Sequence, residues 1–111
     1  MSSDTKGRLW FTELMSGTLG MIDTATNQVV ERAVPTKLGQ PAALYTVVTT
    51  RENAVWFASN NPSALIRYEP ASNTYTFYQV PDPSAAPYGL MLDPTGQLWF
   101  TSISSIGELT P

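Results

Sequence analysis

The sequence predicts an all-β protein, a partial β-propeller of about two and a half four-stranded antiparallel blades with a repeat of about 46 residues. Three observations support this fold class: one strand-like motif occurs three times, segments of alternating polarity surround each copy, and helical periodicity is missing throughout. The copies are GRLWFTE at 7–13, NAVWFAS at 53–59 and GQLWFTS at 96–102. A fixed offset of this length is typical of tandem structural units.

The offset extends beyond this motif. The separation that carries Trp10 onto Trp56 also carries Leu19 onto Leu65, whereas Trp99 follows slightly sooner after its predecessor. A hairpin loop absorbs such a shortening at little cost, because loop closure depends only weakly on length. The main alternative, a β-sandwich of unrelated strands, does not account for the fixed offset.

Each repeat divides into four short predicted strands, named a to d. Strand a is rich in β-branched and aromatic residues, strand b holds the continuous apolar LWF core, and strands c and d alternate apolar and polar positions before turns or a proline. The predicted ranges are 41–50 and 87–93 for a; 7–13, 53–59 and 96–102 for b; 18–23, 64–69 and 105–110 for c; 28–34 and 74–80 for d.

These strands form one predicted domain over residues 1–111. Its first blade contains strands b to d at about 7–35, its second is complete at about 41–81, and its third contains strands a to c at about 87–111. An aromatic pair on every strand b is best explained as packing between neighbouring blades. The predicted packing residues are Trp10, Phe11, Trp56, Phe57, Trp99 and Phe100.

Composition excludes several classes of protein. The chain has 42% hydrophobic and 14% charged residues and a formal net charge of −3, without a basic stripe, so it is expected to fold and not to bind nucleic acid. No apolar run is long enough to span a bilayer and no signal-peptide pattern is evident, which predicts a soluble chain, cytoplasmic or secreted. Zero cysteines and zero histidines exclude disulfides, thiolate metal sites and the commonest general base.

The motifs resemble one known family. GRLWFTE, TLGMID and VVERAVP, followed by NAVWFAS, FYQVP, APYGL, GQLWFTS and SIGEL, are similar to the repeats of virginiamycin B (streptogramin B) lyases and cover nearly the whole chain. The resemblance implies a seven-bladed ring that opens a cyclic depsipeptide by Mg²⁺-assisted elimination. It also implies a histidine just after the proline of strand a and a glutamate at the end of strand b, which meet at one end of the blade.

Only part of that implied pair is present. The histidine position is Ala42 in one repeat and Tyr88 in the next, and the glutamate position is Glu13, Ser59 and Ser102 in turn. Glu13 is therefore the one candidate catalytic residue, with a solvated blade-end residue as the alternative interpretation. Magnesium is expected only if lyase activity is present, and no other cofactor or metal is predicted.

The predicted ring is incomplete. Ten strands leave apolar blade faces and strand edges open, and residues 1–6 are too short to supply the missing strands. We expect self-association, in which a homodimer approximates six blades, or pairing with a complementary propeller fragment; a piece of a longer propeller is the remaining alternative.

Three functions stay open at this point. The first is an assembly-dependent module that binds a small molecule or a glycan, or acts as a scaffold. The second is a streptogramin B lyase-like enzyme completed by missing blades or a partner chain, and the third is a purely structural fragment. For the binding function the candidate contacts at one face of the ring are Tyr88, Ser59, Ser102, Asn60 and Ala42.

Overall fold

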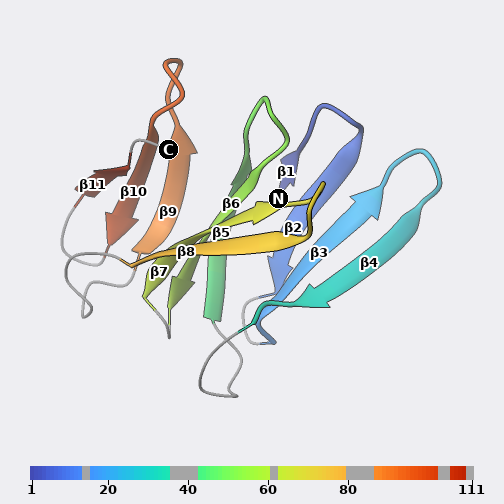
Figure 1. The fold of residues 1–111 in the computed structure, drawn as a ribbon, viewed down its shortest axis with the longest axis horizontal. Helices are drawn as coiled ribbons and strands as arrows, with labels where there is room; N and C mark the ends of the chain where they lie inside the picture. The colour runs from blue at the N-terminus through green and yellow to red at the C-terminus, as the bar shows by residue number, and fades with distance from the viewer. Residues whose placement is uncertain (14–15, 36–42, 61–62, 80–86, 103–105, 110–111) are drawn as a thin grey trace.

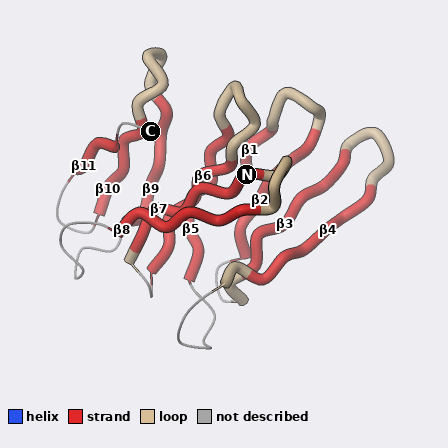
Figure 2. Tube along the Cα trace, in the orientation of Figure 1, coloured by secondary structure: helices blue, strands red, loops and turns tan. Residues whose placement is uncertain are grey.

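The computed structural model describes residues 1–13, 16–35, 43–60, 63–79, 87–102 and 106–109. These residues contain strands and turns but no helix (Figure 2). The strands are β1 (Ser2–Ser3), β2 (Arg8–Glu13), β3 (Thr18–Asp23), β4 (Gln28–Ala33), β5 (Ala43–Thr49), β6 (Val55–Asn60), β7 (Ala64–Glu69), β8 (Thr74–Gln79), β9 (Pro87–Leu92), β10 (Leu98–Ser102) and β11 (Ile106–Leu109).

The strands form three antiparallel sheets that stand side by side (Figure 1). The first has the order β1-β2-β3-β4, the second β5-β6-β7-β8, and the third β9-β10-β11. In each sheet the strands follow one another as a meander, as in the blade of a propeller. The all-β, partial propeller architecture predicted from the repeat is therefore confirmed.

The expected number of strands was wrong by one, because β1 is an additional strand a in the first sheet. Ser2 pairs with Trp10 and Ser3 with Leu9. The Ser2 hydroxyl also accepts a hydrogen bond from the Thr49 amide at 3.2 Å, and the Thr49 hydroxyl donates to the Ser3 carbonyl at 2.6 Å. Two residues are too few to show the alternation of apolar and polar side chains that predicts a strand. The hydrogen bonds to β5 in the second sheet hold β1 in place.

Two apolar cores lie between the sheets. The core between the first and second sheets is built around Trp10 and Leu19 on one side and Phe57 and Tyr68 on the other. The core between the second and third sheets is built around Trp56 and the buried Leu98. In each strand b the tryptophan therefore points toward the side of the next sheet along the chain, which we call the forward face. The leucine or valine before it and the phenylalanine after it point toward the side of the previous sheet, the backward face.

Phe11 lies flat on the backward face of the first sheet because its partner position is a glycine. Phe11 pairs with Gly20, and a Cβ on Gly20 would lie 2.2 Å from the Phe11 ring. No side chain fits in that space without displacing the ring. The glycine of the L-G-M-I segment at 19–22 thus has a packing reason in this sheet.

The hairpin between strands a and b has the same backbone in all three repeats. Gly7, Asn53 and Gly96 occupy equivalent turn positions with φ values of 76°, 65° and 87°. Glycine and asparagine are the residues that adopt this left-handed conformation most readily. The turn therefore keeps its geometry although the residues around it differ.

In the first and third sheets an aspartate at the start of this turn holds the tryptophan of strand b. Asp4 Oδ2 accepts a hydrogen bond from Trp10 Nε1 at 2.9 Å, and Asp93 Oδ2 accepts one from Trp99 Nε1 at 2.9 Å. The other carboxylate oxygen of each aspartate accepts backbone amides of its own turn. One side chain thereby fixes both the turn and the indole.

The second sheet lacks this contact. Thr50 stands at the aspartate position, where its hydroxyl accepts the Ala54 amide at 3.1 Å but the indole receives no carboxylate. Trp56 Nε1 is buried and has no hydrogen-bond partner among the described residues. A buried donor without a partner costs about 1–3 kcal/mol.

We therefore expect Thr50→Asp to stabilise the protein by about 1 kcal/mol, because the new carboxylate would accept both the Ala54 amide and the Trp56 indole. The free energy of unfolding from urea titration measures this gain. Thr50→Ala is the matched control and should destabilise, since it removes the hydroxyl acceptor. A Thr50→Asp variant no more stable than wild type would contradict the expectation.

Candidate functional site

The candidate face lies at the end of the sheets where each strand a begins and each strand b ends. Leu44 pairs with Ser59 in the second sheet, and Pro87 pairs with Ser102 in the third. The hairpins between strands a and b lie at the opposite end (Figure 1). Antiparallel pairing thus brings the predicted positions to one end, although Ala42 lies outside the described residues.

An aromatic pair bridges the second and third sheets at this end. Tyr45 and Tyr88 stack with ring centroids 4.6 Å apart and an interplanar angle of 28°. Tyr88 is 57% exposed, while Tyr45 is half-buried and its carbonyl accepts a hydrogen bond from the Thr12 hydroxyl of the first sheet. The two rings form a supported aromatic platform with one open ring.

Tyr45 was missed in the sequence. Both strands a carry the same bulge, between Leu44 and Val47 in β5 and between Pro87 and Leu90 in β9, so Tyr45 and Tyr88 occupy equivalent positions. Alignment on the repeat proline paired Tyr88 with Ala42, whereas alignment on the tryptophan of strand b pairs Tyr88 with Tyr45.

Glu13 ends β2 and is half-buried. Glu13 pairs with Thr18, and one of its carboxylate oxygens accepts a hydrogen bond from the Ser16 hydroxyl at 3.3 Å. A magnesium ion needs several oxygen ligands in near-octahedral geometry. In the described ranges no group of three or more His, Cys, Asp or Glu side chains gathers that could hold a metal ion.

Ser59 and Asn60 close β6 in different environments. Ser59 is buried, and its hydroxyl has no hydrogen-bond partner among the residues that the structure describes. By strand alternation it shares the backward face with Phe57, toward the first sheet. Asn60 is half-buried and pairs with Ala43. The structure therefore places Ser59 between sheets and not on the surface beside the tyrosines.

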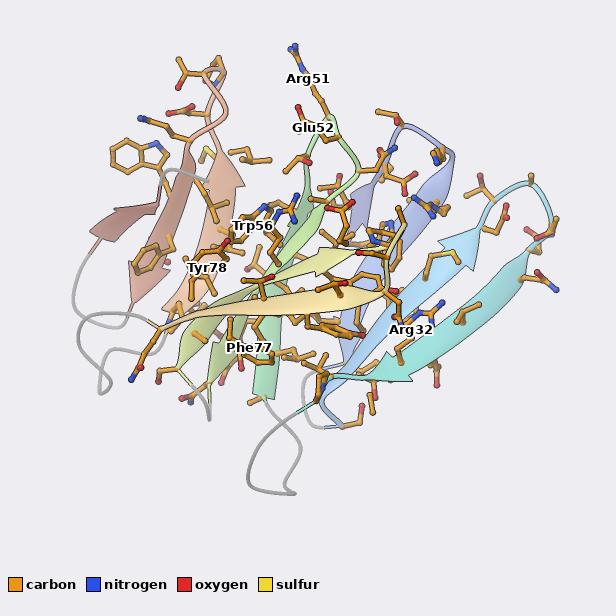
Figure 3. The ribbon with its side chains drawn as sticks, viewed as in Figure 1. Arg32, Arg51, Glu52, Trp56, Phe77 and Tyr78 are labelled. Carbon is orange, nitrogen blue, oxygen red and sulfur yellow. The ribbon has the colours of Figure 1, made fainter. Side chains whose placement is uncertain are left out.

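A shallow hollow of about 120 Å³ lies at the opposite end, between the turns of the first two sheets. Lys6 and Arg8 line it together with Glu52 and Glu69, so its charges offset one another. Arg8 is already paired with Asp4 at 2.6 Å, and Glu69 with Arg67 at 2.8 Å. In Figure 3, Arg51 and Glu52 extend from the hairpin of the second sheet into solvent. We assign no ligand to this hollow.

Two four-stranded meanders and one three-stranded meander, with a tryptophan packed between each neighbouring pair of sheets, define a protein of the β-propeller class. Comparison with known families then identifies which propeller. Residues 1–111 match the virginiamycin B lyase family, and the chain belongs to that family.

Solved structures agree with this assignment. The virginiamycin B lyase of Staphylococcus aureus is 26% identical with a TM-score of 0.84, over 97% of this chain and 36% of that one. A streptogramin B lyase structure is 26% identical with a TM-score of 0.85, and the match covers 98% of this chain and 36% of the lyase chain. The extracellular domain of a putative hybrid two component system from B. thetaiotaomicron shares the fold at 17% identity and a TM-score of 0.78. The match covers 100% of this chain and 15% of that one.

This chain thus spans about a third of the length of the lyases that it matches. Among proteins of curated function, none matches the sequence. The described residues include no helix of the length and apolarity needed to cross a membrane.

Proposed function

We propose that the chain is a propeller module that binds a small molecule or a glycan on the face where the strands a begin, within an assembly that completes the ring. The observation that carries this proposal is the Tyr45–Tyr88 platform, at 4.6 Å and with one ring open to solvent. An exposed aromatic ring backed by a second ring offers a flat apolar surface with a phenolic hydroxyl at its edge. Such surfaces contact ligands with little loss of side-chain freedom.

The platform is also well placed. It joins two sheets, and the Thr12 hydroxyl of the first sheet donates to the Tyr45 carbonyl. Residues from three sheets therefore hold one surface, which is the kind of rigid support that a recognition site needs. The fold by itself leaves the ligand open, because propellers with this repeat serve different functions.

A lyase function is the second candidate, favoured by the family and by Glu13 at the end of β2. In that reaction a base removes a proton and the ring opens by elimination. The half-buried Glu13 carboxylate, which accepts a hydrogen bond from the Ser16 hydroxyl, is the described group that could take this proton. The chain has no histidine, so a histidine would have to come from additional blades or a partner chain.

Ligand titration tests the binding proposal. A related enzyme was solved with quinupristin, so quinupristin, methyl glucoside and methyl galactoside are suitable probes, followed by NMR saturation transfer. We expect at least one probe to bind and Tyr88→Ala to weaken binding about tenfold or more. Tyr88→Phe keeps the ring and is the matched control. Equal binding by wild type and Tyr88→Ala, or no binding by any probe, would contradict the proposal.

The lyase candidate has its own readout. Purified chain is incubated with quinupristin and Mg²⁺, and ring opening is followed by chromatography. Turnover that disappears in Glu13→Gln would establish the enzyme. A chain that binds quinupristin and leaves it intact would establish the binding module instead.

A further inference from the structure

The forward face of the third sheet is an uncovered copy of a face that is buried twice inside the molecule. Trp10 and Trp56 are 2% and 1% exposed, because each packs against the next sheet along the chain. Trp99 occupies the same position in β10 and is 40% exposed. Its strand neighbour Met91 is 65% exposed and lies on the same face, since the two residues pair directly.

The backward face of the first sheet is the complementary uncovered face. In the second sheet the residues at these positions include Val55 and Phe57, which are fully buried against the Trp10 face. Their counterparts Leu9 and Phe11 are only half-buried. Val29 on β4, which pairs with Ile22, is 56% exposed. One end of the stack therefore presents a tryptophan face and the other end presents the face that tryptophans pack against.

We propose that a second copy of this chain covers both faces, with the Trp99 face of each copy docked on the Phe11 face of the other. This names the partner that completes the ring and so rests on the proposed function. The molecule itself supports this occupant, because it joins the same pair of faces at both of its internal sheet interfaces. A contact between different faces closes only if the rotation returns to the start. Two copies supply six sheets, which is within the range of closed propellers.

Strand β1 gives the first sheet a strand a that the sequence does not predict, and this strand lies at the proposed docking surface. Because Ser2 and Ser3 supply a short strand a, the first sheet already has four strands. Inside the chain, strand a contacts strands a and b of the preceding sheet, as β5 contacts β1 and β2 and as β9 contacts β5 and β6. The first sheet, through β1, therefore presents the element that meets a preceding sheet.

The docking would also change the surroundings of the Glu13 carboxylate. Its counterpart in the second sheet, Ser59, is buried between two sheets. Docking on the Phe11 face would place the Glu13 carboxylate in an equivalent interface. The family's one matching carboxylate thus lies where a partner copy encloses it, and the chemistry around it depends on assembly.

Sedimentation velocity from about 1 to 100 µM tests the proposal, because mass action populates the dimer over such a range. We expect wild type to form a dimer and Trp99→Glu to shift its dissociation constant by at least tenfold. Phe77→Glu is the matched control, since Phe77 is a similarly exposed aromatic at 41%, on β8 and outside both faces. Figure 3 shows Phe77 on this outer strand. Phe77→Glu should leave dimerisation unchanged.

A complementation experiment separates docking from misfolding. Trp99→Glu keeps an intact Phe11 face and Phe11→Glu keeps an intact Trp99 face, so each variant should be monomeric while their mixture forms a 1:1 dimer. Two unfolded variants would not restore each other. A monomeric wild type at 100 µM, a dimer unaffected by Trp99→Glu, or a mixture that stays monomeric overturns the proposal. The Tyr88→Ala titration is a separate measurement, so failure of ligand binding and failure of docking remain distinguishable.

Discussion

Phe57→Ala is expected to lower the free energy of unfolding by about 3–5 kcal/mol. Phe57 is fully buried in the core between the first and second sheets, where it packs with Trp10 and Tyr68. The substitution removes apolar contacts and leaves a cavity that two rigid sheets cannot close. Urea denaturation followed by tryptophan fluorescence measures the loss.

The repeat supplies the control for this prediction. Phe11 has the same position in the first sheet but is half-buried, so Phe11→Ala should cost only about 1 kcal/mol in the monomer. Measured at concentrations where copies associate, its cost should rise toward that of Phe57→Ala. Equal costs for both substitutions in dilute monomer would show that the first sheet is already covered.

Asp4→Ala is expected to cost about 2–4 kcal/mol, because one buried carboxylate serves several donors. The Asp4 side chain has no exposed surface. It accepts hydrogen bonds from the Lys6 amide at 2.8 Å, the Arg8 amide at 3.0 Å, Arg8 Nε at 2.6 Å and Trp10 Nε1 at 2.9 Å. Removing it leaves the guanidinium and the indole without their acceptor.

Asp4→Asn is the matched control, since the amide keeps one acceptor oxygen and the size of the side chain. It should cost less than Asp4→Ala but still weaken the pair with Arg8. Thermal unfolding by circular dichroism compares the three proteins. An Asp4→Ala variant as stable as wild type would mean that water replaces the carboxylate at no cost.

The two turn aspartates also predict how stability depends on pH. Burial alone would raise the pKa of Asp4, but hydrogen bonds from the Trp10 indole and the Arg8 and Lys6 amides lower it below its ordinary value. Hydrogen bonds from the Thr95 hydroxyl and the Trp99 indole lower the pKa of Asp93 to about 2. Carboxylates with depressed pKa values stabilise the fold above the unfolded pKa of about 4, and this contribution is lost as pH falls through the folded values.

Wild type should therefore lose stability progressively between about pH 4 and pH 2. An Asp4→Asn/Asp93→Asn variant should show a flatter profile in this window, because neither side chain titrates. Urea midpoints measured across the window compare the two proteins. Parallel profiles would assign the acid sensitivity to other carboxylates.

The fold was predictable from the sequence because every blade of a propeller packs against its neighbour through the same kind of interface. Trp10 and Trp56 recur at one offset since each must fill the same space between sheets. Strand β1 was not predictable, because two serines carry no period and their pairing depends on Thr49 in another sheet. The turn aspartates were also missed, since Asp93 beside a proline and a glycine reads as an ordinary turn residue.

The candidate site was less predictable than the fold. Antiparallel pairing correctly placed Ser59 at the end of strand b, but alternation within the strand decides which face it occupies, and that face is covered. The Tyr45–Tyr88 pair joins equivalent positions of two neighbouring sheets, and a contact between sheets cannot be predicted from the sequence of a single repeat. Whether Ala42 contributes stays a prediction.

Trp56 lies between the second and third sheets without the carboxylate that holds Trp10 and Trp99, and it contacts Tyr78 at 5.2 Å between ring centroids (Figure 3). Burial alone does not explain the difference, since Trp10 is equally buried and is still bound by Asp4. Ring packing, and not a turn hydrogen bond, thus fixes the central indole, and Trp56 Nε1 stays without a partner among the described residues.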